Sequence, residues 1–232
     1  MNVDGGGARK KDLPEKGAII QRDRQTYAIA PHLPGGLLTK EILLRYDDLF
    51  DRYDIQAMKI TGAQRIAIIG FKEEQLDQVW SELKMKPGAA IGLCVRSVEM
   101  CPGTTFCKLG QQDSMGLGLK LDEKYHGMEL PGKFKFAVAG CPMNCVAAPV
   151  RDIGIQGTPR HWKILVGGCL GPRPRMGREL ASVESADEVL AIVDRVVQFF
   201  VKNAQHRDRL GRLIDRAGWE PFVEAVIGKA SL

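Results

Sequence analysis

The stretch FKFAVAGCPMNCVAAPVRDIGIQG, residues 134–157, sets a short hydrophobic strand pattern directly before two cysteines and a glycine-rich segment. Cys141 and Cys145 are separated by three residues, and a proline follows the first of them. That proline removes a backbone donor and stiffens the loop. The stretch therefore predicts a strand that ends in a rigid loop carrying two thiols.

The chain has 232 residues, of which 44% are hydrophobic, so it can bury the core of one domain or of two closely packed ones. Its apolar runs are far shorter than the ~20 residues of a membrane-spanning helix, and its N-terminus lacks an apolar signal core. We therefore expect a cytoplasmic protein that contacts no membrane. In that reducing compartment, clustered cysteines favour metal binding over disulfides.

The formal net charge is +5, but acidic residues are interleaved with basic ones along almost the whole chain. The one dense basic cluster is PRPRMGR, residues 172–178, and no nucleic-acid-binding motif accompanies it. We therefore expect no nucleic-acid partner. The excess of positive charge is better suited to small anionic ligands.

Composition and periodicity divide the chain into three parts. Residues 1–16 are glycine-rich and charged, which predicts a flexible arm. Residues 17–88 predict a β-α-β-β-α unit, with Thr39 as the N-cap of its first helix. The strands of this unit are expected at 26–31, 57–61 and 65–69, and its second helix around 76–83.

Residues 89–232 predict a mixed α+β region with strands at 133–139, 153–156 and 161–166, separated by loops rich in Gly and Pro. Its C-terminal end reads as helical. Ser185 and Glu188 have the spacing of a capping box before a long amphipathic helix, and shorter helices are expected at 207–216 and 219–227. The predicted fold class is α+β.

A second cysteine pair, Cys101 and Cys107, has five residues between its members and also opens with Cys-Pro. Structural zinc sites favour spacings of two to four residues. A cubane iron–sulfur cluster is wider than a single ion, so its ligands can be spread over longer loops. The four thiols of the two pairs therefore favour a cluster, while zinc and unrelated buried cysteines stay open as alternatives.

CPGTTFC at 101–107, together with KFKFAVAGCPMNCVAAPVRDIGIQG at 133–157 and WKILVGG at 162–168, resembles the nitrite and sulfite reductases that contain sirohaem. Upstream, LPGGLLTKE and KITGAQRIAIIGF are similar to the ferredoxin-like half-domain that precedes the cluster domain in that family. The resemblance covers nearly the whole chain after Gly17. Because the chain has one copy of this arrangement, it most resembles the small assimilatory-type sulfite reductases.

The resemblance implies a ferredoxin-like half-domain followed by an α+β sirohaem and 4Fe-4S domain with a helical end. It also implies that Cys101, Cys107, Cys141 and Cys145 bind the 4Fe-4S cluster, with Cys145 also the axial thiolate of the sirohaem iron. A shared sulfur couples the two redox centres directly. Asn144, between the last two cysteines, is expected to contact the cofactors.

Sulfite and nitrite are anions, so their reduction requires cations and proton donors. The resemblance assigns Lys133, Lys135 and Arg96 to the substrate; the two lysines share one face of the predicted strand by its two-residue period. His32 stands where many relatives have an arginine that completes the anion pocket. A histidine there can donate a proton or simply pack.

A second departure concerns the sirohaem carboxylates. Relatives carry Thr-Thr-Arg-Gln where this chain has Thr-Gly-Ala-Gln, so Thr61 and Gln64 are kept while Ala63 replaces the arginine. Arg65 is one candidate replacement, and Arg173 and Arg175 of the PRPRMGR loop are others, because guanidinium groups bind carboxylates well.

We therefore expect a sirohaem-dependent reductase that converts sulfite to sulfide, with nitrite reduction to ammonia as the alternative within catalysis. A cluster-containing electron-transfer protein without a substrate site is the alternative outside it. No flavin or nicotinamide motif is visible, so electrons are expected from a redox partner such as a ferredoxin. A homodimer is a further expectation, because two-fold dimers are the commonest oligomers.

Overall fold

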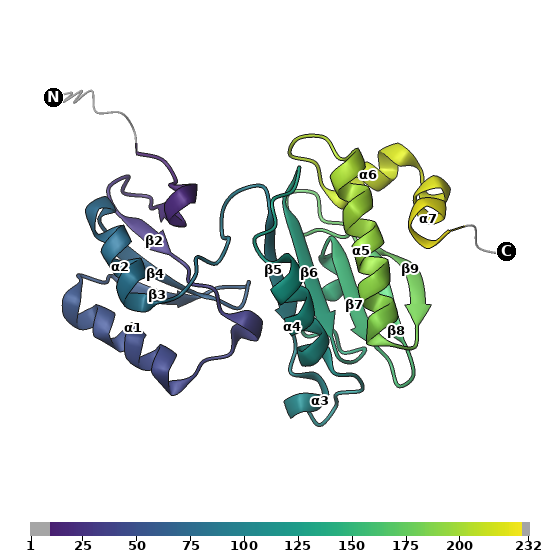
Figure 1. Cartoon of the computed structure of the whole chain (residues 1–232), viewed down its shortest axis with the longest axis horizontal. Helices are drawn as coiled ribbons and strands as arrows, with labels where there is room; N and C mark the ends of the chain where they lie inside the picture. The colour runs from purple at the N-terminus through teal and green to yellow at the C-terminus, as the bar shows by residue number, and fades with distance from the viewer. Residues whose placement is uncertain (1–9, 229–232) are drawn as a thin grey trace. The chain divides into compact units, whose positions relative to one another are not determined.

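The computed structural model describes residues 10–228, which form two compact units divided between Ile91 and Gly92 (Figure 1). The sequence predicted this boundary three residues earlier, after Gly88. Each unit has its own hydrophobic core. No helix among the described residues combines the length and the hydrophobicity needed to cross a membrane.

Part of the predicted N-terminal arm has defined structure. Its first nine residues lie outside the described residues, but Leu13 pairs with Ala18 in a β-bridge and Pro14–Lys16 form a 3-10 helix. The indole of Trp80 donates a hydrogen bond of 2.7 Å to the carbonyl of Lys16. The arm prediction is therefore wrong for residues 13–16, since contacts with the half-domain offset the cost of ordering them.

The first unit is a four-stranded antiparallel sheet in the order β1-β2-β4-β3 with two helices. The Thr39 hydroxyl accepts a hydrogen bond from the backbone N–H of Ile42, which confirms the predicted N-cap. Its elements are β1 (Ala18–Ile20), β2 (Tyr27–Ile29), η2 (Pro34–Gly36), α1 (Lys40–Arg52), β3 (Ala57–Ile60), β4 (Ile66–Phe71), η3 (Glu73–Gln75) and α2 (Leu76–Leu83).

The second unit is a five-stranded sheet in the order β5-β6-β7-β8-β9. Strands β5, β6 and β7 run parallel, whereas β8 and β9 are antiparallel additions. Its elements are β5 (Val95–Met100), α3 (Gly103–Phe106), α4 (Ser114–Tyr125), β6 (Phe134–Ala139), η4 (Ala148–Val150), β7 (Ile153–Gly157), β8 (Trp162–Val166), β9 (Arg178–Val183), α5 (Ala186–Asn203), α6 (Leu210–Ala217) and α7 (Trp219–Ile227). The sequence analysis did not predict β5, β9 or α4.

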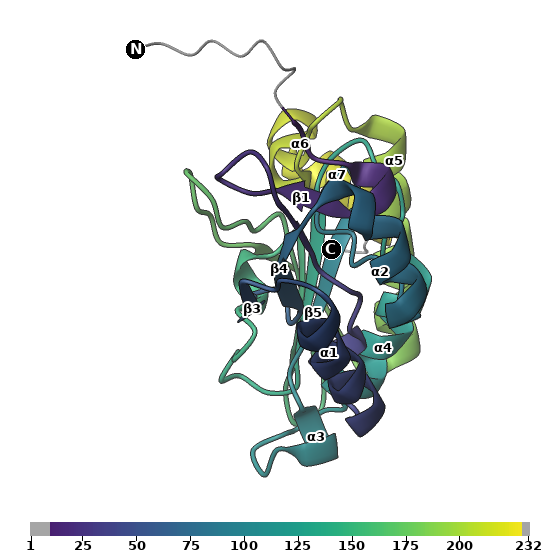
Figure 2. The ribbon, with the colours of Figure 1, turned by 90° about the vertical axis from the view of Figure 1, so that its left-hand side faces the viewer.

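The two faces of this sheet differ. Large apolar side chains of β6, such as Phe134 and Phe136, are fully buried in the core under helices α4 and α5. On the opposite face the same strand presents small residues, and Ala137 and Ala139 pack against Ala148 of the η4 loop. Figure 2 shows α4 and α5 on one side of the sheet and long loops on the other. The loop-covered face is therefore the one available to a ligand.

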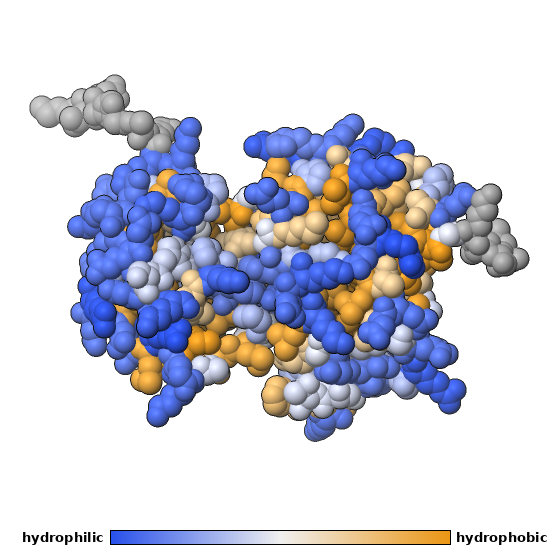
Figure 3. All heavy atoms as spheres, in the orientation of Figure 1, coloured by the Kyte–Doolittle hydropathy of each residue, from blue (hydrophilic) through white to orange (hydrophobic). Residues whose placement is uncertain are grey.

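Surface hydropathy is uneven. On the side that Figure 3 draws, hydrophilic residues cover much of the first unit, while hydrophobic residues are visible around the C-terminal helices. These helices pack against the same core, since Phe222 and Val226 of α7 are fully buried in it.

The predicted capping box at the start of α5 is present. The Ser185 hydroxyl accepts from the Glu188 N–H at 3.2 Å, and the Glu188 carboxylate accepts from the Ser185 N–H at 2.9 Å. We expect Ser185→Ala to lower the free energy of unfolding by about 1 kcal/mol, because one N–H at the helix start loses its partner. Denaturant unfolding of the two proteins measures this difference. An unchanged midpoint would show that water replaces the cap without cost.

Candidate functional site

The cysteines gather at one edge of the second sheet because β5 and β6 are parallel. Cys101 follows β5 directly, and Cys141 follows β6 after one glycine. The Cys101 N–H donates to the Val138 carbonyl at 3.0 Å, and the Gly140 N–H donates to the Cys101 sulfur at 3.1 Å. The two strand ends therefore bring one thiol of each sequence pair to the same edge.

The loop after α3 packs against the same point. The N–H groups of Gln111 and Gln112 both donate to the carbonyl of Gly140, at 2.9 and 3.0 Å, and the Cys107 N–H donates to the Gly103 carbonyl. Glycine is required here: a Cβ on Gly140 would lie 2.8 Å from the Gly103 Cα. The backbones of the two cysteine loops are therefore in direct contact.

Exposure differs among the four thiols. Cys101 and Cys141 are buried, Cys107 is half-buried and Cys145 is exposed. Soft thiolates on loops from several segments are typical ligands of an iron–sulfur cluster. Among residues 10–228, no group of three or more His, Cys, Asp or Glu side chains is arranged around a single metal ion.

Asn144 lies in the loop between Cys141 and Cys145 and has a left-handed backbone, with φ of 57°. Its side-chain Oδ1 is buried without a hydrogen-bond partner in the described structure. A buried polar atom of this kind points to a group outside the chain that completes the site. The loop therefore fits a bound cofactor.

The opposite ends of β5 and β6 carry positive charge. A cavity of about 560 Å³ there is lined by Gly92 and Leu93 and by a set of basic side chains. Those side chains are Arg96, Lys133, His206, Arg207, Arg209 and Arg212. No carboxylate is among the described residues that line it, so the cavity fits an anion.

The basic side chains of this cavity change the pKa of Lys133. The Arg96 guanidinium lowers the pKa of its ammonium group below the ordinary value, and burial, Arg209 and Arg207 lower it further. Like charges gathered in one cavity are costly unless an anion offsets them. Arg96 and Lys133, which the resemblance assigned to the substrate, therefore lie in one cavity.

A second cavity, of about 760 Å³, shares Lys133, Arg209 and Arg212 with the first. It is also lined by Cys169, Arg173, Arg175 and Asp215. Arg175 donates to the Asp215 carboxylate at 2.5 and 3.0 Å, so part of its charge is neutralised and the pKa of Asp215 is lowered. Arg173 and Arg175 thus border the same space as Lys133.

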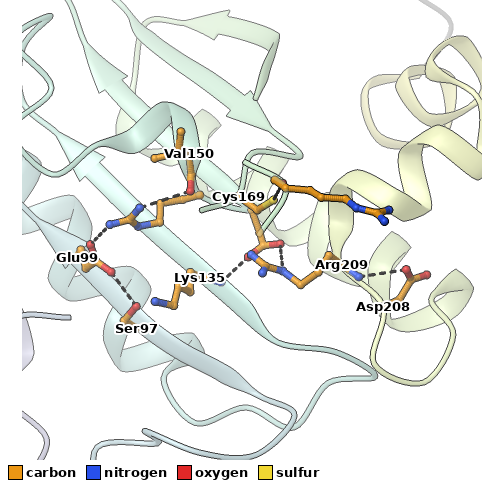
Figure 4. A network of polar contacts seen from close by, with 10 residues as sticks. Ser97, Glu99, Lys135, Val150, Cys169, Asp208 and Arg209 are labelled. Atoms are coloured by element: carbon orange, nitrogen blue, oxygen red, sulfur yellow. Dashed lines mark hydrogen bonds and ion pairs between the residues drawn. The ribbon is translucent and has the colours of Figure 1, made fainter. Parts of the chain in front are cut away.

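Lys135 lies on the loop-covered face of β6 and is half-buried. Figure 4 shows its side chain extending toward Ser97 and Glu99 of β5. Glu99 forms a buried ion pair with Arg151, whose Nε has no hydrogen-bond partner in the described structure. Lys135 is not among the described residues that line either cavity. The structure therefore separates the environments of the two predicted substrate lysines.

Sequence reasoning missed Arg151 and the arginines before and within α6, which are Arg207, Arg209 and Arg212. The run HRDRLGR, residues 206–212, was a visible signal, since it holds three arginines within seven residues. It did not stand out because its acidic neighbours made it resemble a solvated surface segment.

The remaining predicted residues belong to the half-domain. The Thr61 hydroxyl donates to the Arg65 carbonyl at 3.0 Å across the tight turn between β3 and β4, and Gln64 has a φ of 55° in that turn. Arg65 is buried and packs against Gly88, where an added Cβ would lie 2.8 Å from its Cδ. His32 is half-buried, and its N–H donates to the Lys86 carbonyl.

Two family models match the chain with this arrangement. The nitrite and sulphite reductase 4Fe-4S domain matches residues 91–231, and the nitrite/sulfite reductase ferredoxin-like half domain matches residues 19–86. The chain belongs to the nitrite and sulfite reductase family. Its cofactors are those of the family, a 4Fe-4S cluster and sirohaem, and it is an oxidoreductase. The zinc interpretation is therefore wrong.

Relatives in this family differ in length. The chain is 40% identical over 213 residues to the assimilatory-type sulfite reductase of Nitratidesulfovibrio vulgaris, covering 92% of this chain and 98% of that protein. It is 38% identical to the NAD(P)H nitrite reductase of Bacillus subtilis, covering 87% of this chain but only 25% of the relative.

Solved structures show the same fold. Dissimilatory sulfite reductase I matches with a TM-score of 0.79 at 18% identity, over 88% of this chain and 70% of that one. The Mycobacterium tuberculosis NirA protein matches with a TM-score of 0.71 at 24% identity, over 89% and 41%. The predicted fold class, a ferredoxin-like half-domain followed by an α+β domain with helices at its end, is confirmed.

The contact at Gly140 yields a test of the cysteine loops. We expect Gly140→Ala to lower the iron and acid-labile sulfide content of the purified protein, because the new Cβ forces the two cysteine loops apart. Gly62→Ala is the matched control, since no atom lies within 4 Å of a Cβ built there. Equal iron and sulfide in both variants would contradict the close packing of these loops.

The lowered pKa of Lys133 predicts a pH dependence of anion binding in the first cavity. The cationic form binds anions, so affinity should fall as pH rises through this lowered pKa. Arg96→Gln removes the largest cause of the lowered Lys133 pKa. The loss of affinity should therefore occur at higher pH in this variant, and anion binding at neutral pH should also be weaker. Titration of the protein with sulfite across pH measures both effects. A fall at the same pH in the variant would exclude Lys133 as the titrating group.

Proposed function

We propose that this protein is an assimilatory-type sulfite reductase that reduces sulfite to sulfide. The observation that carries the proposal is the separation of two sites on the same pair of strands. Thiols lie where β5 and β6 end, and an anion cavity lies where they begin. In this proposal, electrons arrive at the end of the strands that carries the thiols, and the anion binds at the opposite end.

Four thiols are proposed to hold the cluster: Cys101, Cys107, Cys141 and Cys145. Cys145 is proposed as the shared ligand, and its exposure in this structure leaves its sulfur accessible to a second metal. When bound, the cluster and sirohaem supply single electrons and an iron that holds the central atom of the substrate. Asn144 is placed beside these thiols to contact the cofactors.

In the proposed mechanism, the cationic cavity binds and orients the anion. Arg96 and Lys133 attract the sulfite oxygens, and Lys133 releases a proton more readily than an ordinary lysine because of its lowered pKa. Lys135 is proposed to act on the same substrate from the loop-covered face of β6. Protons delivered in this way let each departing oxygen leave as water.

Basic and polar groups are proposed to bind the carboxylates of the cofactor. In the second unit these are Arg173 and Arg175, which border the second cavity. In the half-domain they are Thr61, Gln64 and Arg65. Arginine is well suited to this role because it binds carboxylates in a bidentate manner. His32 is proposed to act on the substrate anion, in place of the arginine that completes the anion pocket in many relatives.

The share of each relative's length that this chain covers favours sulfite over nitrite as the substrate. The chain matches 98% of a protein named an assimilatory-type sulfite reductase, whereas it spans about a quarter of the nitrite reductase of Bacillus subtilis. We propose a cytoplasmic enzyme that takes electrons from a small redox partner such as a ferredoxin. A homodimer is proposed as its assembly.

The test uses protein purified anaerobically from a host that makes sirohaem, with iron, sulfide and the visible spectrum measured on one sample. We expect sulfite-dependent oxidation of a chemically reduced viologen dye, faster than with nitrite. A loaded protein that turns over neither anion would instead be an electron carrier. Faster turnover of nitrite would favour the second substrate.

Substitutions locate the substrate site. We expect Lys133→Ala and Lys135→Ala each to lower sulfite turnover by about tenfold or more with the cofactors retained, because one cation and proton source is lost. Lys163→Ala is the matched control, since this β8 lysine pairs with Glu179 at 3.0 Å outside both cavities. Wild-type turnover in the two test variants would overturn the assignment of these lysines.

A further inference from the structure

The carboxylate of Asp152 is fully buried between the sheet and α6. Its two oxygens accept from the Arg209 guanidinium, Oδ1 from Nε at 2.9 Å and Oδ2 from Nη2 at 2.8 Å. Oδ2 also accepts from the backbone N–H of Lys135 at 3.0 Å. Figure 4 shows the dashed contacts of Arg209 and of the main chain of Lys135, which lie close together. One carboxylate thus joins β6 to the residue that precedes α6.

Burying a carboxylate costs free energy unless its lone pairs accept hydrogen bonds. The buried carboxylate of Asp152 therefore requires an explanation. The bidentate contact uses two of the three guanidinium nitrogens and fixes the plane of the group. Arg209 lines both cavities, and it is one of the groups that lower the pKa of Lys133. The carboxylate therefore determines where a central positive charge of the anion site lies.

We propose that Asp152 is a positioning residue for substrate binding, which holds Arg209 in the wall shared by the two cavities and so keeps the cationic site preorganised for the anion. The proposal rests on the proposed function in that the anion is sulfite. Neither residue was singled out by the sequence pattern, and the role belongs to the pair rather than to Arg209 alone.

The loss of a negative charge and the loss of a fixed side-chain position are expected to change anion affinity in opposite directions. Asp152→Asn removes a negative charge next to the cavities, and charge alone would then strengthen anion binding. Loss of the bidentate contact frees the Arg209 side chain, and the anion must then order it on binding. We expect the second effect to prevail, with sulfite affinity about tenfold weaker in Asp152→Asn than in the wild type.

A second variant tests the same contact without changing charge. Arg209→Lys keeps the positive charge but cannot make a bidentate contact with the carboxylate. We expect it also to weaken sulfite binding. It decides the question alone if the asparagine variant does not fold, because it leaves no charge uncompensated in the interior.

The pH profile adds a readout that a purely structural role would not move. The charged or titratable groups around Lys133 come from several elements. In the first cavity they are Arg96 from β5, Arg212 from α6, and His206, Arg207 and Arg209 from the segment before α6. In the second cavity they also include Cys169, Arg173 and Arg175 from the loop after β8, and Asp215 from α6. If Arg209 is displaced in Asp152→Asn, the loss of sulfite affinity should occur at higher pH than in the wild type. If only charge matters, it should occur at lower pH.

The experiment titrates the loaded protein with sulfite, follows the visible spectrum at several pH values, and records thermal unfolding of each variant. Asp194→Asn is the matched control, because that carboxylate accepts from Lys124 and Tyr125 between α4 and α5, outside both cavities. We expect it to lower stability and leave sulfite affinity unchanged.

The outcomes separate the two proposals. Weaker binding in both site variants, with an unchanged control, supports the positioning role. Wild-type or tighter binding in both overturns it while leaving the reductase proposal intact. If the wild type binds neither sulfite nor nitrite, the proposed function fails and the positioning role fails with it.

Discussion

Parallel pairing of β5 with β6 is the constraint on which the rest of the site depends. Parallel strands begin at one edge of a sheet and end at the other, so whatever precedes them is gathered at one edge and whatever follows them at the opposite edge. Here cations precede the strands and thiols follow them. The register, with Phe136 opposite Val98, also directs the large side chains of both strands into one core. On the loop-covered face, the apolar residues of β6 are the small Ala137 and Ala139.

Much of this arrangement could be predicted from the sequence, because local signals and global structure agree. The Ser185 capping box, the Thr39 cap and the alternation in FKFAVA all correspond to observed features. Strand β5 was not predicted, because VRSVEM mixes charged and apolar residues in a pattern with a β-bulge near Arg96. A bulge breaks the two-residue period on which strand prediction depends.

The candidate site was predictable where chemistry depends on spacing and unpredictable where it depends on tertiary contact. The four cysteines were chosen by their spacing and by the resemblance to the family, and Arg96 and Lys133 by the resemblance. The pairing of Asp152 with Arg209 joins residues 57 positions apart, and no local pattern in either segment reveals it. The same holds for Glu99 and Arg151, which are 52 positions apart. These pairs form only when the chain folds.

The two ends of β6, which has six residues, lie about 20 Å apart at ~3.3 Å per residue, with Lys133 before one end and Gly140 after the other. Substitutions that far apart and without shared partners usually have additive effects on stability. A double-mutant cycle between a cavity residue such as Lys133 and a loop residue such as Gly140 should therefore show no coupling in the protein without its cofactors. Any coupling that appears only once they are bound then reports communication carried by the cofactors themselves, since the protein without cofactors serves as the reference.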